Sequence, residues 1–325
     1  MARIVDETQA LDLAVGEIDA GRLVALPTET VYGLAADATN GAAVASIYET
    51  KGRPRFNPLI VHVDGWELAQ RVGTFDRLSR RLGEAFWPGP LTIVVPLAAG
   101  SPVHPLVAAG LDTVAVRMPR GFARDLIGRL GRPIAAPSAN SSGRISGTSA
   151  QAVEADLGGR IGLIVDGGQT RVGVESTIIR IDGDTITLLR PGGVTAEDIE
   201  KVAGVPVARR KHDAAVVAPG MLASHYAPAA AMRLDVMEVR PGEALLAFGP
   251  VRAAGAGTAS HALNLSAAGD LREAAANLFA HMQALDASGA ATIAVEPVPH
   301  EGLGEAINDR LARAAAPRDS AAAST

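Results

Sequence analysis

The sequence contains no cysteine, which excludes disulfide bonds, thiolate metal sites, iron–sulfur clusters and cysteine nucleophiles. It also lacks an apolar run of the ~18 or more residues that a membrane-spanning helix needs. Acidic side chains stand near the N-terminus, where a signal peptide would be apolar. We therefore expect a cytoplasmic protein that does not bind membranes.

Aromatic residues and lysine are both scarce. Aromatics make up 3% of the chain, so alanine and aliphatic side chains must fill the core that a 48% hydrophobic composition allows. Only three of the 30 basic residues are lysines, and the net charge is −5. This charge argues against coating of nucleic acid by bulk attraction, so that any polyanion must bind in a local basic pocket.

Familiar catalytic and nucleotide-binding motifs are missing as well. There is no Gly-Lys dipeptide and hence no P-loop, and no Gly-x-Ser-x-Gly elbow. The segment Gly302-Leu303-Gly304 lacks the third glycine of a dinucleotide fingerprint. The seven histidines have no metal-ligand spacing, so we expect no dedicated metal site in the protein.

Short β-branched runs bounded by proline and glycine alternate with alanine- and leucine-rich stretches, which predicts an α/β (mixed α+β) fold. Helices are expected at residues 7–20 and 41–51 and from Thr195, strands at 23–26, 59–63, 91–95, 113–117, 134–136 and 162–165, and a hairpin at 178–182 and 185–189.

The length of 325 residues predicts two domains. Residues 205–231 are rich in turn signals and are expected to be a linker, neither strand nor helix. Residues 1–204 then form the first domain. Strand and helix patterns alternate within 232–317, which predicts a small parallel Rossmann-like domain, and the Ala/Ser-rich tail 318–325 is expected to be disordered.

Polar residues follow the apolar strands, at the position where open α/β sheets usually bind ligands. These segments are 27–33, 137–143 and 173–177, and each could equally be an ordinary polar turn. Residues 51–55 contain three cations, which form either a solvated helix end or an anion clamp. Arg117 shares a strand face with Thr113 and is expected beside it, either gripping a carboxylate or phosphate or making a surface salt bridge.

Taken together, these segments resemble the YrdC-like family, and in particular its long members that make threonylcarbamoyl-AMP. The resemblance covers nearly the whole chain. It rests on the segments LPTETVYGLAADA (26–38), YETKGRPRFNPLIVHV (48–63), WPGPLTIVVP (87–96), VAVRMPR (114–120), PIAAPSANSSGRISGT (133–148), VESTI (174–178), LLRPGG (188–193), APGMLASHYAPAA and GLGEAINDRLARAA.

The resemblance implies a YrdC-like twisted mixed sheet with flanking helices, followed by the Rossmann-like domain. It also implies a nucleotidyltransferase that joins L-threonine, bicarbonate and ATP into L-threonylcarbamoyl-AMP and releases pyrophosphate, with Mg²⁺ and no organic prosthetic group. The product would serve the threonylcarbamoyladenosine modification of tRNA through a separate transferase complex, so that tRNA and tRNA-modification proteins are further expected partners.

Site residues follow from the matched motifs. The signature set expected to hold the ATP phosphates and carry catalysis is Lys51, Arg53, Ser138 and Asn140. The other expected ATP contacts are Asn57, Thr113, Ser146, Arg190 and Tyr226, and the expected L-threonine contacts are Thr30, His62, Arg117 and Ser176. The resemblance implies that the carboxylated amine of the substrate is itself the nucleophile, so cations and hydrogen-bond donors matter more than a protein nucleophile.

Tyr226 matches an ATP contact although it lies in the expected linker, so the linker is expected to act as a lid that excludes water. Two alternatives remain open at this point. One is an RNA-binding module that uses the same basic surface, and the other is a regulatory paralogue within the family.

Overall fold

The computed structural model of the chain describes residues 1–210 and 225–317. These residues form two compact units. The N-terminal unit comprises 1–142 and 146–210, and the C-terminal unit comprises 143–145 and 225–317. The expected tail 318–325 and residues 211–224 of the expected linker lie outside the described residues. Within the described part of the chain, no helix is long and apolar enough to cross a membrane.

The N-terminal unit is built on one mixed sheet of eleven strands, in the order β1-β8-β2-β3-β7-β4-β6-β5-β9-β10-β11. The predicted strands and the hairpin are all present, with ends within about one residue of the expected ones. The strands are β1 (Arg3–Asp6), β2 (Val24–Leu26), β3 (Gly33–Asp37), β4 (Ile60–His62), β5 (Leu91–Pro96), β6 (Thr113–Arg117), β7 (Ile134–Ala135), β8 (Leu163–Asp166), β9 (Thr177–Asp182), β10 (Thr185–Arg190) and β11 (Val207–Arg209).

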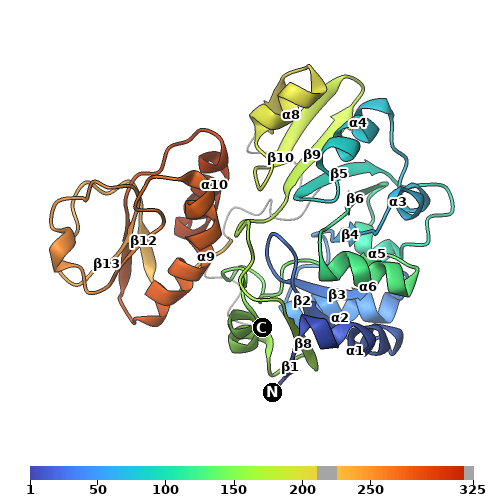
Figure 1. The fold of residues 1–325 in the computed structure, drawn as a ribbon, viewed down its shortest axis with the longest axis horizontal. Coiled ribbons are helices and arrows are strands. Elements are labelled where there is room, and N and C mark those ends of the chain that lie inside the picture. The colour runs from blue at the N-terminus through green and yellow to red at the C-terminus, as the bar shows by residue number, and fades with distance from the viewer. Residues whose placement is uncertain (211–224, 318–325) are drawn as a thin grey trace. The chain divides into compact units, whose positions relative to one another are not determined.

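Helices flank this sheet, and Figure 1 shows α1, α2 and α6 together beside strands β2 and β3. Small and aliphatic side chains form the core between them, as the composition predicts. The helices of this unit are α1 (Glu7–Asp19), α2 (Gly41–Lys51), α3 (Trp66–Val72), α4 (Arg77–Phe86), α5 (Pro105–Ala108), α6 (Phe122–Leu130), α7 (Ala150–Leu157) and α8 (Ala196–Ala203).

The ends of α2 are fixed by local chemistry. The side chain of Asn40 accepts hydrogen bonds from the first free N–H groups of the helix, which belong to Ala42 and Ala43. At the other end Gly52 adopts the left-handed conformation with φ 59°, which glycine tolerates without strain. The helix therefore stops directly after Lys51, as the sequence predicts, and this end positions the Lys51 side chain.

The expectation that residues 205–231 contain neither strand nor helix is wrong. Val207–Arg209 forms β11, which pairs in parallel with β10, and Ala231 begins strand β12. Both strands have three residues, and two of the three side chains of β11 are exposed. Such short edge strands leave little hydrophobic pattern for a sequence-based prediction.

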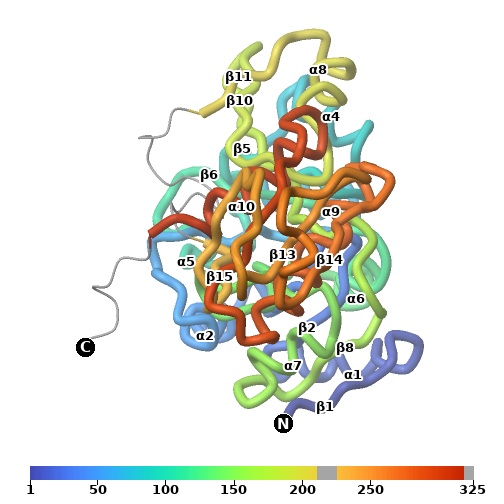
Figure 2. Tube along the Cα trace, turned by 90° about the vertical axis from the view of Figure 1, so that its left-hand side faces the viewer, coloured from blue at the N-terminus to red at the C-terminus, as the bar shows by residue number. Residues whose placement is uncertain are grey.

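The C-terminal unit is a four-stranded, entirely parallel sheet in the order β12-β15-β13-β14. This arrangement confirms the predicted parallel layer. Helices α9 and α10 lie together on one face of this sheet in Figure 1, and Figure 2 shows β13, β14 and β15 side by side. The elements are β12 (Ala231–Arg233), β13 (Ala244–Ala247), the 3₁₀ turn η1 (Ala256–Thr258), β14 (Ala262–Asn264), α9 (Leu271–Ala287), β15 (Thr292–Val295) and α10 (Leu303–Ala315).

Candidate active site

A buried lysine lies at the centre of the first group of candidate residues. Lys51 is 3% exposed, and its Nζ donates hydrogen bonds to the backbone carbonyl of Ser138 at 2.6 Å and to that of Asn140. Burial, and then the nearby charge of Arg53, lower the pKa of Lys51 well below its ordinary value. The alternative of a solvated helix end is therefore wrong for Lys51, and a bound anion would stabilise its charged form.

Arg53 and Asn57 form the second half of this group. Arg53 donates to the Asn57 side-chain oxygen and to the Pro58 carbonyl, both at 2.7 Å, and this fixes the guanidinium in the interior. Asn57 is fully buried, and among the described residues no acceptor takes a hydrogen bond from its Nδ2. The protein thus leaves a buried amide donor available to a ligand. We call Lys51, Arg53, Asn57, Ser138 and Asn140 the lysine cluster.

Two distant motifs meet at the lysine cluster because β3 pairs with β7. Tyr32 donates its N–H to the carbonyl of Gly147 at 2.9 Å, and Ala139 donates to the carbonyl of Tyr32 at 2.7 Å. Leu34 donates to Pro137 at 2.7 Å. Backbone hydrogen bonds therefore join segment 27–33 to segment 137–148, although the two are far apart in the sequence.

Arg117 forms a second group with His62 and Glu29. His62 ends β4 opposite Arg117 in the parallel register with β6. The Arg117 side chain is only 5% exposed, and its Nη2 lies 2.7 Å from Oε1 of Glu29. The alternative of a surface salt bridge is therefore wrong, because Arg117 forms a buried ion pair with Glu29. The expectation that Arg117 lies beside Thr113 is wrong, because the two residues are at opposite ends of β6, about 13 Å apart at ~3.3 Å per residue.

Ser176 and Arg190, which the family resemblance assigns to different substrates, are in direct contact. Arg190 donates to the Ser176 carbonyl at 2.8 Å and to its hydroxyl at 3.2 Å. The Ser176 hydroxyl also lies 2.7 Å from that of Thr92 on β5. Gly192 packs so closely on this backbone that a Cβ would come within 2.3 Å of the Glu175 carbonyl, which explains the glycine two positions after Arg190.

Acidic residues within the matched motifs were missed by the sequence analysis. Glu175 is buried and accepts a hydrogen bond from Ser146 at 2.6 Å, and Glu29 pairs with Arg117. Both glutamates stand next to a predicted residue in their motif, Ser176 and Thr30 respectively. A carboxylate inside a polar strand-end segment was the signal that could have identified them. Thr30 itself is fully buried, with its hydroxyl 2.8 Å from that of Thr28.

Tyr226 belongs to the C-terminal unit. It is 1% exposed, stacks on Phe279 with a ring-centroid distance of 5.4 Å, and lies under the Arg310 guanidinium at 5.2 Å from its ring. Its φ of 62° is unusual for a residue with a side chain. The C-terminal unit therefore holds this residue of the expected linker in a defined position.

The lowered pKa of His62 predicts that the fold loses stability in acid. Burial, and then the Arg117 charge, lower the pKa of His62 to about 3. Because the unfolded chain binds this proton near pH 6.5, the stability that the neutral imidazole provides is complete above pH ~6.5 and is lost as the pH falls toward 3. We expect His62→Asn to remove about 3 kcal/mol of this acid dependence between pH 7 and 4, measured by urea unfolding. The exposed His300→Asn is the control, and an equal pH dependence in His62→Asn and wild type would contradict the prediction.

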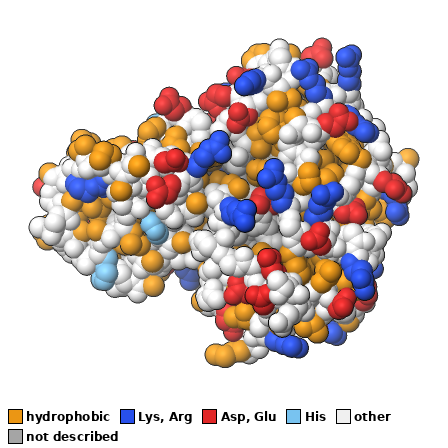
Figure 3. Space-filling view, viewed as in Figure 1, with side chains coloured by type: hydrophobic (Ala, Val, Ile, Leu, Met, Phe, Trp, Pro, Cys, Tyr) orange, Lys and Arg blue, Asp and Glu red, His pale blue; other side chains and the backbone are white. Residues whose placement is uncertain are grey.

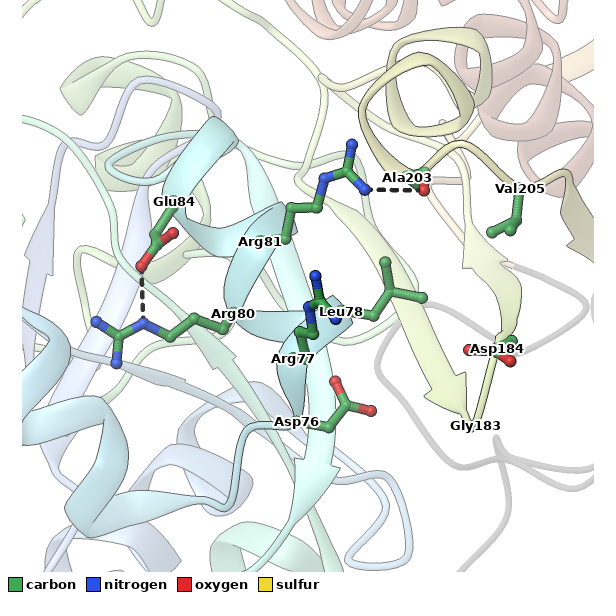
Figure 4. A pocket seen from close by; sticks show the side chains of 10 residues that line it. All are labelled: Asp76, Arg77, Leu78, Arg80, Arg81, Glu84, Gly183, Asp184, Ala203 and Val205. Atoms are coloured by element: carbon green, nitrogen blue, oxygen red, sulfur yellow. Dashed lines mark hydrogen bonds and ion pairs between the residues drawn. The ribbon is translucent and has the colours of Figure 1, made fainter.

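A cavity of about 710 Å³ lies elsewhere in the N-terminal unit, between α4 and the β9–β10 turn (Figure 4). Three arginines and three carboxylates line it; Arg80 pairs with Glu84 at 2.8 Å, and Arg81 donates to the Ala203 carbonyl. The formal charges of its lining side chains sum to zero, so charge alone does not mark this cavity as a phosphate site. On the face seen in Figure 3, basic and acidic side chains are likewise interspersed. Within the described ranges, no group of three or more His, Asp or Glu residues could hold a metal ion.

Comparison with known proteins identifies the family. Residues 17–192 match the Sua5_yciO_yrdC family, described as "Telomere recombination", and residues 194–316 match the "Threonylcarbamoyl-AMP synthase, C-terminal domain". The threonylcarbamoyl-AMP synthase of Pyrococcus abyssi is 41% identical over 95% of this chain and 94% of its own length. The chain belongs to the two-domain threonylcarbamoyl-AMP synthases.

Other members of the synthase family are similar to this chain over nearly its whole length. The Bacillus subtilis threonylcarbamoyl-AMP synthase is 40% identical over 97% of this chain and 96% of its own length. The crystal structure of P. abyssi Sua5 complexed with L-threonine matches with a TM-score of 0.86 and 38% identity, over 97% of this chain and 98% of that one. This confirms the predicted fold and the nucleotidyltransferase class, with a product that serves the threonylcarbamoyladenosine modification of tRNA.

Proposed function

We propose that the chain joins L-threonine, bicarbonate and ATP into L-threonylcarbamoyl-AMP with release of pyrophosphate, at the lysine cluster and the Arg117 group of its N-terminal unit. The observation that supports this most directly is the buried Lys51, a cation whose ammonium has, among the residues that the structure describes, only backbone carbonyls as hydrogen-bond partners. The proposed location is the cytoplasm. The proposed further partners are tRNA and the proteins that modify it.

ATP binds the lysine cluster in this proposal. The reaction brings a carbamate to the α-phosphate, so several negative charges gather in one place. A preorganised ammonium, a guanidinium and the Asn57 Nδ2, which has no acceptor among the described residues, offset that charge without reorganising in the transition state. The proposed ATP contacts are Lys51, Arg53, Asn57, Thr113, Ser138, Asn140, Ser146, Arg190 and Tyr226, of which Lys51, Arg53, Ser138 and Asn140 carry catalysis.

L-Threonine binds at the Arg117 group, with Arg117 holding the substrate carboxylate. The P. abyssi relative was crystallised with L-threonine, which supports an amino-acid site in this fold. His62 stays neutral beside Arg117, so it offers a hydrogen bond to the substrate without adding charge. The proposed threonine contacts are Thr30, His62, Arg117 and Ser176.

Mg²⁺ enters this proposal together with ATP. It prefers oxygen ligands and usually binds through one or two carboxylates, waters and the substrate phosphates. Glu175 fits that requirement, since it is a buried carboxylate whose charge acts on Lys51. The ion would neutralise phosphate charge when bound, while Glu175 and Ser146 orient each other through their hydrogen bond at 2.6 Å.

The domain division remains part of the proposal. We assign catalysis to the N-terminal unit, residues 1–142 and 146–210, and a supporting role to the C-terminal unit, residues 143–145 and 225–317. Tyr226 is proposed as the ATP contact contributed from outside the catalytic domain. Phe279 and Arg310 hold its ring within the C-terminal unit, where the side chain is 1% exposed.

The direct test measures pyrophosphate release from ATP with Mg²⁺, omitting L-threonine and bicarbonate one at a time. We expect release only when both are present, because the carbamate made from them attacks the α-phosphate. Release that depends on neither would contradict the proposed reaction. Dependence on another amino acid would keep the chemistry and change the substrate.

The RNA-binding alternative predicts a different dependence on conditions. A protein that binds the phosphate backbone loses affinity steeply as salt increases, whereas the proposed ATP site responds chiefly to Mg²⁺ and threonine. Titrating a labelled tRNA at 50 and at 200 mM salt separates the two alternatives. A protein that makes ~6–10 phosphate contacts would lose about 10³–10⁵-fold in affinity over this rise in salt.

A further inference from the structure

Glu29 occupies an unexpected place, next to the arginine that we assign to the substrate carboxylate. Its Oε1 lies 2.7 Å from Arg117 Nη2, and the two side chains are only 10% and 5% exposed. The other oxygen, Oε2, accepts the backbone N–H of Arg120 at 3.1 Å. The Glu29 backbone is held as well, because Val172 donates to its carbonyl at 2.9 Å. Glu29 is therefore a fixed carboxylate.

The ion pair leaves hydrogen-bonding capacity unused. Although Glu29 Oε1 and Arg117 Nη2 are close, they are not aligned as a hydrogen bond, and among the described residues neither atom has a hydrogen-bond partner. Arg117 uses its Nε for the Gly89 carbonyl at 3.3 Å. A buried acceptor and a buried donor thus lie side by side, each able to bind one more group.

Charge determines which ligand suits this pair. A carboxylate that approaches Arg117 alone also meets the negative charge of Glu29 at nearly the same distance, so that attraction and repulsion largely cancel. His62 lies on the neighbouring strand and is neutral, so it does not change this balance. An α-amino acid brings an ammonium bonded to the same carbon as its carboxylate. Its two charges match Glu29 and Arg117 one to one.

We propose that Glu29 binds the α-ammonium of the amino acid whose carboxylate is held by Arg117. The Glu29–Arg117 pair then selects a zwitterion, and the site rejects carboxylates that lack the ammonium. This inference rests on the proposed function, because it takes Arg117 as the carboxylate ligand. It adds a specificity-determining residue that holds the reacting nitrogen at a defined position before the amine is carboxylated.

The test compares two ligands that differ only at the α-position. L-Threonine and its 2-hydroxy analogue, 2,3-dihydroxybutanoate, share the carboxylate, the β-hydroxyl and the methyl group. In the wild-type protein, calorimetric titration should show threonine binding at least about 100-fold more tightly, as expected when a buried polar group loses its ligand partner. Equal affinities in the wild-type protein would overturn the inference without any variant.

Glu29→Gln keeps the shape and removes the charge. We expect its threonine affinity to fall about 30-fold or more, and its affinity for the hydroxy acid to stay equal or rise, because a repulsive carboxylate is gone. If both ligands weaken by the same factor, Glu29 only orients Arg117 and the inference is wrong. The matched control is Glu84→Gln, an exposed glutamate that also pairs with an arginine. A wild-type protein that binds no threonine would instead contradict the proposed function.

Discussion

Lys51→Met is expected to lower threonine-dependent pyrophosphate release by about 10²–10³-fold, the usual effect of removing one preorganised charge-stabilising donor. Lys51 is the buried cation whose Nζ donates hydrogen bonds to the backbone carbonyls of Ser138 and Asn140. Both of these residues belong to the signature set that the family resemblance predicts. Methionine fills a similar volume but would leave the phosphates of ATP without the ammonium partner that we propose for them. Initial rates at saturating ATP, threonine and bicarbonate measure the loss.

Stability has to be measured in the same experiment. Without Nζ, two carbonyls lose a donor, at a cost of about 1–3 kcal/mol for each one that stays buried and unpaired. The structure therefore predicts a loss of stability as well as a loss of activity. Rates are therefore compared well below the unfolding temperature of the variant. Lys201→Met, at an exposed lysine in the last turn of α8, is the control, and wild-type turnover in Lys51→Met would contradict the assignment.

Local sequence signals predicted the elements that local chemistry controls. Asp-Gly at 182–183 predicted the β9–β10 hairpin, Gly52 predicted the end of α2, and Thr195 caps α8 by accepting the Asp198 N–H at 3.1 Å. In each case the decisive contact joins residues a few positions apart. Such contacts are visible in the sequence because turn and cap geometry select particular residue types.

Long-range pairing was not predictable in the same way. Strand β3 consists of Gly33-Leu34-Ala35-Ala36-Asp37, which has mostly small residues and no β-branched or aromatic ones, and β2 and β7 pair with it on either side. Glu29 and Arg117 are 88 positions apart, and their contact depends on the fold that brings segment 27–33 to the end of β6. The family resemblance indicated both motifs, but only the structure shows that a carboxylate neutralises the arginine.

Arg310→Met is expected to destabilise the C-terminal unit by about 3–5 kcal/mol, the usual cost of breaking a buried ion pair by removing one partner. Arg310 is fully buried, lies 2.7 Å from Asp309, and covers the ring of Tyr226. Urea unfolding followed by circular dichroism measures the change. Arg313→Met is the matched control, since Arg313 also pairs with Asp309, at 3.0 Å, but its side chain is 16% exposed, and we expect a smaller loss.

Arg310→Met also tests the proposal that Tyr226 contributes to ATP binding. Tyr226 is held in a left-handed conformation between Phe279 and Arg310, and a residue with a side chain keeps that conformation only when its surroundings enforce it. If Tyr226 contacts ATP as proposed, loosening this support should raise the KM for ATP while the KM for threonine stays near its wild-type value. A variant that is destabilised yet keeps the wild-type KM for ATP would show that Arg310 stabilises the unit alone, and the ATP contact would then have to be sought elsewhere than at Tyr226.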